Sequence, residues 1–144
     1  MKVNLNHQLN NSYFKGVEIL SVGTELLLGN IVNTNAQWIS EELSSLGVNH
    51  FRQSTIGDNS NRISKVIKEI SLRSSLLITT GGLGPTPDDL TTEAIAKSFN
   101  TPLFERKYLW AEIKKKLSDS SSILETSSLK KQCFFPKDAQ IINN

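Results

Sequence analysis

The chain has 144 residues, of which 38% are hydrophobic and 21% charged, and its formal net charge at pH 7 is +2. These values are typical of a folded protein about one domain long, and they exclude collagen-like, coiled-coil and mucin-like chains. Sixteen basic against fourteen acidic residues are too evenly balanced to indicate nucleic-acid binding, which needs a concentrated basic face. The single cysteine, Cys133, excludes an intrachain disulfide and a multi-cysteine zinc site.

The hydropathy pattern predicts neither a membrane span nor a secretory signal. No run of the sequence approaches the roughly 18 apolar residues that a span needs, so we expect no membrane association and a cytoplasmic location. Residues 1–15 are rich in asparagine and poor in apolar anchors, and they are expected to form a disordered leader. The fold is then expected to occupy residues 16–144.

From Gly16 onward, short runs of β-branched residues alternate with segments of helical periodicity. This alternation predicts a layered α/β domain with a mostly parallel sheet. Strands are predicted over residues 17–22 and, more weakly and nearer a sheet edge, over 48–56. The run over 75–80 is the most apolar, so we expect it to be a central strand.

Helices are predicted after each of these strands. The first has Asn33 or Thr34 as its cap and ends at Gly47. The second is capped by a residue within 58–60 and buries one apolar face. The third begins near Thr91, with Asp88 and Asp89 as its caps and with Ala94, Ile95 and Phe99 toward the core.

The last third of the chain has a weaker pattern. An amphipathic helix is predicted over 105–117, and the serine-rich residues 118–122 indicate a flexible link. A short helical turn and one strand, over 139–142, are expected in the remaining tail. No covering element follows that strand before the sequence stops.

In an open parallel sheet, ligands bind outside the carboxyl ends of the strands. The loop Gly81-Gly82-Leu83-Gly84 lies at such a position, between a buried strand and a helix. Backbone N–H groups in a glycine-rich loop can approach an anionic oxygen, which favours a phosphate ligand. The same residues also suit a tight turn that only needs positive φ, and the spacing leaves both interpretations open.

Acidic residues follow the predicted strands and make the same end of the sheet a candidate site. Asp88 and Asp89 follow the glycine loop, and Asp58 follows the strand over 48–56. Each could cap a helix, coordinate Mg²⁺ or act in acid–base chemistry. Glu25 could add a third carboxylate, and Asn33 could cap its helix or bind a ligand. We expect the two acidic loops to converge with the glycine loop.

Three segments closely resemble the amino-terminal domain of CinA-like (competence/damage-inducible) proteins, a member of the molybdopterin-binding MoaB/Mog superfamily. The resemblance is carried by residues 18–36, by Arg52-Gln53 with Gly57-Asp58-Asn59, and by residues 79–91 with Glu93-Ala94. It implies a three-layer α/β/α fold with a mostly parallel sheet. Its ligand loops match Glu25, Asn33, Asp58, Gly81, Gly82, Gly84, Asp88 and Asp89.

The resemblance also implies a function. Relatives in molybdenum-cofactor synthesis bind molybdopterin, and the CinA-like branch hydrolyses the pyrophosphate bond of ADP-ribose with a divalent metal, Mg²⁺ or Co²⁺. Backbone N–H groups of the glycine loop would hold phosphate, Asp58 and Asp89 would position the metal, and Glu25 would orient a water or the metal. Gly81, Gly82, Gly84, Asp88 and Asn33 would contact the ligand.

Two departures from the family pattern bear on activity. Family members usually carry Asn-x-Lys-Gln-Ala where this chain reads Leu129-Lys130-Lys131-Gln132-Cys133, and they continue with a Pro-x-Gly-Thr-Ala-Pro-Gly loop after residue 144. We therefore expect a domain truncated at its carboxyl end, with its last elements missing. Such a chain would form a homo-oligomer or need a separately encoded remainder. An active hydrolase, a non-catalytic pterin- or nucleotide-binding module and an inactive fragment all stay open.

Overall fold

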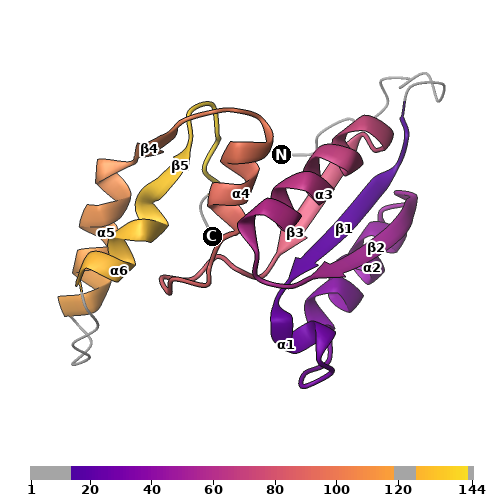
Figure 1. Ribbon diagram of the computed structural model, residues 1–144, viewed down its shortest axis with the longest axis horizontal. Helices are drawn as coiled ribbons and strands as arrows, with labels where there is room; N and C mark the ends of the chain where they lie inside the picture. Colours follow the sequence, from indigo (N-terminus) through magenta and orange to yellow (C-terminus); the bar gives the residue numbers. More distant parts are fainter. Residues whose placement is uncertain (1–13, 119–125, 143–144) are drawn as a thin grey trace.

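The computed structural model describes residues 14–118 and 126–142. Three parallel strands form a sheet in the order β2-β1-β3, with bounds Val17–Val22 for β1, His50–Ile56 for β2 and Leu76–Thr80 for β3 (Figure 1). Residues 1–13 of the expected leader and residues 119–122 of the expected link lie outside the described residues.

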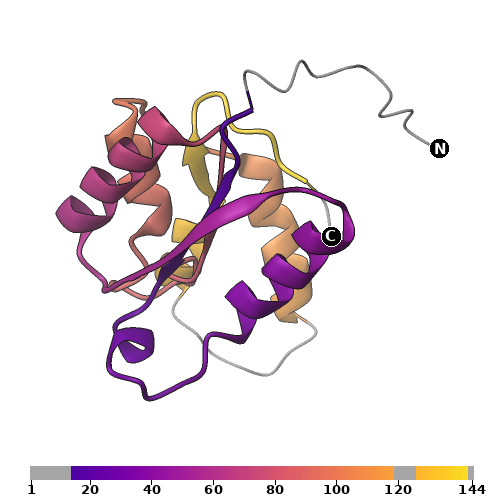
Figure 2. The same cartoon turned by 90° about the vertical axis from the view of Figure 1, so that its right-hand side faces the viewer.

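Helices cover both faces of this sheet. Helix α2 (Thr34–Ser45) lies on one face and helix α3 (Ser60–Arg73) on the other, as Figure 2 shows. Helix α4 (Thr91–Ser98) packs beside α3. The expected three-layer α/β/α architecture with a parallel sheet is therefore confirmed.

The central strand β1 is buried along its whole length because each of its faces meets a helix layer. Leu20 and Val22 pack against α3, whereas Val17 and Ile19 pack against α2. This is the two-residue alternation of a strand that is covered on both sides. The apolar partners from the helices are Ile63, Ile67 and Ile70 on one face and Ala36 and Leu43 on the other.

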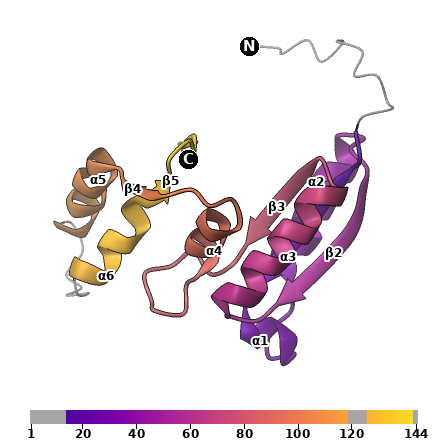
Figure 3. The same cartoon turned by 45° about the horizontal axis from the view of Figure 1, so that its top comes forward.

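A second, smaller unit follows α4 along the chain. Strands β4 (Leu103–Glu105) and β5 (Phe134–Pro136) pair antiparallel, and helices α5 (Lys107–Ser118) and α6 (Thr126–Lys130) lie beside them (Figures 1 and 3). A single 3-10 turn, η1 (Lys131–Cys133), leads from α6 into β5. Cys133 is fully buried there. In Figure 3, α4 lies between this unit and the three-stranded sheet.

The structure corrects two predictions about strands. The run over 75–80 forms β3, but β1 is the central strand, and within the described residues β3 pairs on one side only. Apolar content could not identify the central strand, because β1 contains the charged residue Glu18. Glu18 can be buried there since Arg73 neutralises its charge in an ion pair. The predicted strand over 139–142 is also wrong: the tail strand is β5, at Phe134–Pro136.

Two predictions about α4 are also corrected. Its N-cap is Leu90, which makes no side-chain capping bond, so neither Asp88 nor Asp89 caps the helix. Phe99 follows the last turn and is 56% exposed, so it does not face the core as expected, although Ala94 is fully buried. The residues predicted to cap α2 and α3 include the observed caps. The side chain of Asn33 accepts a hydrogen bond from the N–H of Ala36, and that of Asn59 accepts one from the N–H of Arg62.

At the opposite end of β1 from the glycine loop, a buried carboxylate ties β1 to α3. Both carboxylate oxygens of Glu18 accept hydrogen bonds from Arg73, each at 2.7 Å, and Ser74 donates a third. The hydrogen bond from Arg73 is the main reason that the pKa of Glu18 lies below its usual value, and it outweighs the opposing effect of burial. This pair fixes the last turn of α3 against the sheet.

Candidate functional site

The glycine loop after β3 is held by one buried residue at the start of α4. The N–H of Thr91 donates to O of Gly82 at 3.1 Å, and the hydroxyl of Thr91 donates to O of Gly81 at 2.7 Å. Thr91 is fully buried. The carbonyls of Gly81 and Gly82 are therefore both directed toward the first turn of α4.

Gly81 and Gly82 are required by sterics as well as by their backbone angles. Their φ values are +85° and +60°, a region that residues with a Cβ rarely adopt. A Cβ on Gly81 would collide with the carbonyl of Val22, and one on Gly82 would lie 2.5 Å from Oγ1 of Thr91. Both glycines are thus needed for the tight turn, and this structural role is compatible with ligand binding at the same loop.

The N–H groups of the loop are the feature that suits an anion. In a trans peptide the N–H points opposite to the preceding carbonyl, so the N–H groups of Gly82 and Leu83 point away from Thr91. Among the described residues, no acceptor receives a hydrogen bond from either N–H group. Two successive donors are therefore available at the carboxyl end of the sheet.

Asp89 closes the other end of the loop. Its Oδ2 accepts from the N–H and from the hydroxyl of Thr86, at 2.8 and 2.6 Å, and its carboxylate packs against Gly84. Burial alone would raise the pKa of Asp89, but hydrogen bonds from Thr86 and from the Gly84 backbone, with the charge of Lys131, lower it overall. Asp89 is therefore an ionised brace of the loop at neutral pH.

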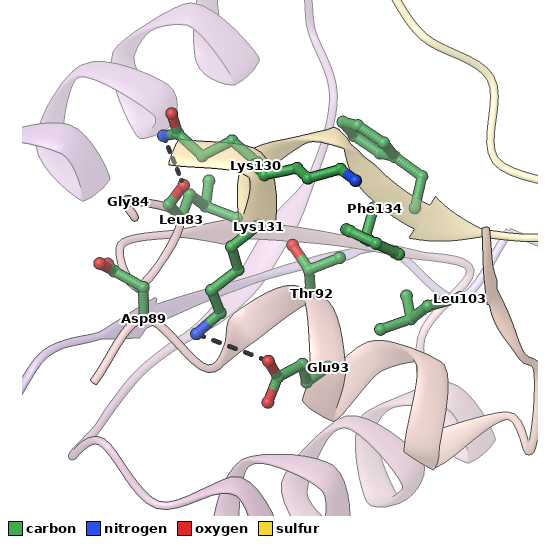
Figure 4. Close-up of a pocket in the computed structure, with 12 residues that line it drawn as sticks. Leu83, Gly84, Asp89, Thr92, Glu93, Leu103, Lys130, Lys131 and Phe134 are labelled. Carbon is green, nitrogen blue, oxygen red and sulfur yellow. Dashed lines mark hydrogen bonds and ion pairs between the residues drawn. The ribbon is translucent and has the colours of Figure 1, made fainter. Parts of the chain in front are cut away.

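A pocket of about 830 Å³ opens beside this loop (Figure 4). One wall is the loop itself with Asp89 and the first turn of α4, and the opposite wall comes from η1 and the β4–β5 pair. Polar and charged groups lie near the loop, whereas apolar side chains together with Lys130 line the rest. The lining residues that matter here are Gly82, Leu83, Gly84, Asp89, Glu93, Leu103, Lys131, Gln132, Phe134 and Phe135.

Of these residues, only Gly82, Gly84 and Asp89 were predicted as site residues, and Lys131 and Gln132 are among those that were not. Nζ of Lys131 donates to O of Thr86 at 3.2 Å, and Nε2 of Gln132 donates to O of Leu83 at 3.3 Å. Gln132 thus joins η1 to the glycine loop, and Lys131 joins it to the turn that follows the loop, across 49 and 45 residues of sequence. The only signal was the partial match of residues 129–133 to a family motif, which gives no position relative to the loop.

The predicted site residues do not all converge. Gly82, Gly84 and Asp89 line the 830 Å³ pocket, whereas Gly81, Glu25 and Asn33 line a smaller one of about 110 Å³ on the other side of the loop. Asp58 and Asp88 line neither pocket.

Three of these side chains have partners on their own side of the site. Asp58 accepts from the N–H and hydroxyl of Thr24, at 2.9 and 2.8 Å. Asn33 donates to Oγ of Ser21 at 2.9 Å while capping α2, and the carboxylate of Glu25 folds back over Gly23. Glu25 and Asn33 therefore meet the glycine loop at Gly81, whereas Asp58 is held by Thr24 and lines neither pocket.

These carboxylates do not fit a preformed metal centre. In residues 14–118 and 126–142, no three Asp, Glu, His or Cys side chains gather closely enough to hold an ion. Oδ2 of Asp89 accepts two hydrogen bonds from Thr86 in its own loop, and Oδ2 of Asp58 accepts two from Thr24, which follows β1. In the same part of the chain, no helix has the length and apolar character needed to cross a membrane.

Comparison with known proteins places these features in a family. The family model described as a probable molybdopterin binding domain matches residues 18–142. A CinA-like protein of Prochlorococcus marinus strain MIT 9515 is 83% identical over 144 residues, and one of strain NATL1A is 53% identical over the same length. The alignments cover 100% of this chain and 33% of each relative, so the chain spans about a third of their length.

Several solved structures resemble this one. CinA of Thermoplasma acidophilum has a TM-score of 0.80 and 31% identity, and the match covers 91% of this chain and 76% of that one. MoaB, a molybdopterin biosynthesis enzyme of Thermus thermophilus, has a TM-score of 0.54 and 23% identity, with 79% and 70% covered. The second likeness supports the fold alone.

Proposed function

This chain belongs to the CinA-like proteins and their probable molybdopterin binding domain, and from that premise we propose that it binds a phosphorylated ligand in the pocket beside the glycine loop. The ligand class is a pterin or nucleotide that carries a phosphate or diphosphate. Its phosphate would accept hydrogen bonds from the N–H groups of Gly82 and Leu83.

The orientation of the loop peptides is the observation that carries this proposal. Thr91 holds the carbonyls of Gly81 and Gly82, which leaves two adjacent N–H groups pointing away from α4 without an acceptor among the described residues. Gly82 is half-buried and Leu83 is exposed, so a ligand can reach these N–H groups and replace water as their acceptor. A phosphate oxygen satisfies such groups without the repulsion that a carbonyl-lined loop would cause.

The apolar end of the pocket supports the choice of ligand class. Leu103, Phe134 and Phe135 line it, and the polar loop lies at the other end. A ligand that joins a phosphate to a flat aromatic ring matches both ends, because the ring can pack on phenyl groups while the phosphate meets the N–H groups. The pocket volume of about 830 Å³ is in the range that small-molecule sites occupy.

Binding is tested by calorimetry with ADP-ribose and, as the probe that lacks phosphate, adenosine. We expect ADP-ribose to bind and adenosine to bind far more weakly. Gly82→Ala should abolish binding of ADP-ribose, because its Cβ would lie 2.5 Å from Oγ1 of Thr91. Gly47→Ala is the matched control: it has a φ of +68° but nothing within 4 Å of its added Cβ. Equal loss of binding in both variants would attribute the effect to instability and remove the support for this loop.

Hydrolysis of the ADP-ribose pyrophosphate bond, giving AMP and ribose 5-phosphate, is our second proposal. It is supported by the relationship to CinA-like proteins and by the ionised Asp89 beside the loop. The described carboxylates do not fit a preformed metal centre. An assay therefore has to test whether hydrolysis depends on Mg²⁺ or Co²⁺ and whether Asp58 and Asp89 hold the ion. The proposed role of Glu25 is tested in the same way.

The assay follows AMP release from ADP-ribose with and without each divalent ion. Asp89→Asn keeps an oxygen that can accept from Thr86, so we expect it to bind ADP-ribose and to lose turnover. Equal turnover by Asp89→Asn and the unaltered chain would exclude Asp89 from the reaction. Binding of ADP-ribose without AMP release by the unaltered chain would show a non-catalytic binding module.

A further inference from the structure

One ammonium group in the pocket is held between the glycine loop and an acidic side chain. Nζ of Lys131 lies 3.5 Å from Oε1 of Glu93 (Figure 4). It also lies 3.2 Å from O of Thr86. The Lys131 side chain is 27% exposed and that of Glu93 46%. Lys131 and Glu93 both line the pocket together with Gly82 and Leu83. An internal ion pair therefore lies where a ligand phosphate would enter.

The surroundings of Lys131 differ from those of the neighbouring lysine. Lys130 pairs with Glu105 on β4, at 3.4 Å, whereas Lys131 faces Glu93 and also lowers the pKa of Asp89. Both lysines line the pocket, and Lys131 is the one within reach of the two carboxylates Glu93 and Asp89. Its separation of 3.5 Å from Glu93 is longer than a close charged hydrogen bond, and the pair is partly solvated, so the attraction is weak.

We propose that Lys131 is the phosphate-binding cation of this pocket and that Glu93 competes with the ligand for it. This inference rests on the proposed function, because it names the charged residues that bind and repel phosphate in the same ligand site. A phosphate carries more negative charge than a carboxylate and offers several acceptor oxygens, so it can replace Glu93 at the ammonium. The Glu93–Lys131 pair then sets the affinity of the site.

A purely structural role for the pair predicts a different result. If Lys131 only braces the loop through Thr86, and Glu93 only orients Lys131, removing the charge of Glu93 should weaken binding or leave it unchanged. Competition predicts the opposite sign, because Glu93→Gln releases the ammonium and removes a negative charge that repels phosphate. The sign of the Glu93→Gln effect separates the two roles.

The test measures the Kd of the whole chain for inorganic pyrophosphate and for ADP-ribose by calorimetry, at several salt concentrations. We expect Glu93→Gln to lower both Kd values severalfold. Lys131→Met should raise them about tenfold or more and flatten their salt dependence, since one charged contact is lost. Lys131→Arg should recover part of the affinity. Lys68→Met removes a positive charge from the exposed side of α3 and should change neither Kd.

Different outcomes overturn different statements. If the unaltered chain binds neither probe, the proposed function fails and this inference fails with it. If the unaltered chain binds but Glu93→Gln binds equally well or more weakly, only the competition between Glu93 and ligand is overturned. Affinity of Lys131→Met equal to that of the unaltered chain likewise overturns the role of Lys131. Should Lys131→Met fail to fold, Glu93→Gln alone decides, because it changes one exposed side chain by a single charge.

Discussion

The hydroxyl of Thr91 donates a 2.7 Å hydrogen bond to the carbonyl of Gly81, and this contact sets the direction of the peptides that follow. Thr91 is not a candidate ligand contact, since it is fully buried. It acts through the loop: its hydroxyl and its N–H hold two successive carbonyls on the side of α4. The N–H groups proposed to bind phosphate are therefore oriented before any ligand arrives, which lowers the entropic cost of binding.

Replacing Thr91 by valine tests this positioning role. Thr91→Val keeps the shape of the side chain but leaves the Gly81 carbonyl without its donor, which should destabilise the fold by about 1–2 kcal/mol. We expect the Kd for ADP-ribose to rise severalfold as well, because the loop loses one of the two hydrogen bonds that it receives from Thr91. Urea unfolding measures the first effect and calorimetry the second. Thr91→Ser retains the hydroxyl and should bind nearly as the unaltered chain does; weak binding by the serine variant would contradict the role of this hydrogen bond.

The sequence predicted the glycine loop well and the far wall of the pocket poorly, for a physical reason. Strand, loop and helix around Gly81 are contiguous, so spacing and glycine content locate them together. Lys131 and Gln132 reach the same loop through η1, after α5 and α6, and no periodicity records such a long-range contact. Asp58 lies outside the pocket for a related reason: following a strand places a side chain at the correct end of the sheet but does not set its direction.

Capping failed at α4 because a competing partner lies nearby. Asp89 precedes the helix at a position where a carboxylate often caps, yet the N–H and hydroxyl of Thr86 already satisfy it. A local Asp–Thr contact across three residues lowers the pKa of Asp89 and braces the proline-rich turn. The residue types in this segment are compatible both with capping of α4 by Asp89 and with the contact between Asp89 and Thr86. Only the backbone path distinguishes these two arrangements.

The pKa of Asp89 predicts an acid-sensitive site. Its folded value lies below the usual one, so the stabilisation from the ionised carboxylate is present above about pH 3.9, the ordinary value for Asp, and is lost as pH falls through the lowered value. We expect proteolytic cleavage within 84–88 to increase in that acidic range. Asp89→Asn should remove this pH dependence. Identical pH profiles for the two proteins would contradict the brace that Asp89 forms.

The Glu18–Arg73 pair predicts a second, separate acid effect at the other end of β1. The pKa of Glu18 is lowered mainly by its hydrogen bond with Arg73, so the pair stabilises the fold above about pH 4.3 and this contribution is lost as pH falls below that value. Thermal unfolding between pH 3 and pH 7 should show a falling Tm on the acidic side. Arg73→Met should lower Tm at pH 7, because it leaves a buried carboxylate without its cation. An unchanged Tm at pH 7 would show that the pair contributes nothing.

The unpaired side of β3 leads to a prediction about self-association. Within the described residues β1 is the one strand that pairs with β3, and Leu76 at its start is 48% exposed. A pocket of about 350 Å³ runs beside this strand between α3 and α4, and Phe99 contributes an exposed apolar rim. Apolar strand edges of this kind tend to pair with other chains. We expect the protein to self-associate at high concentration in sedimentation velocity, and Leu76→Lys to reduce that association without changing ADP-ribose binding, since Leu76 lies outside the pocket beside the glycine loop. A monomer at every concentration would show that this edge, although open to solvent, does not recruit a second copy.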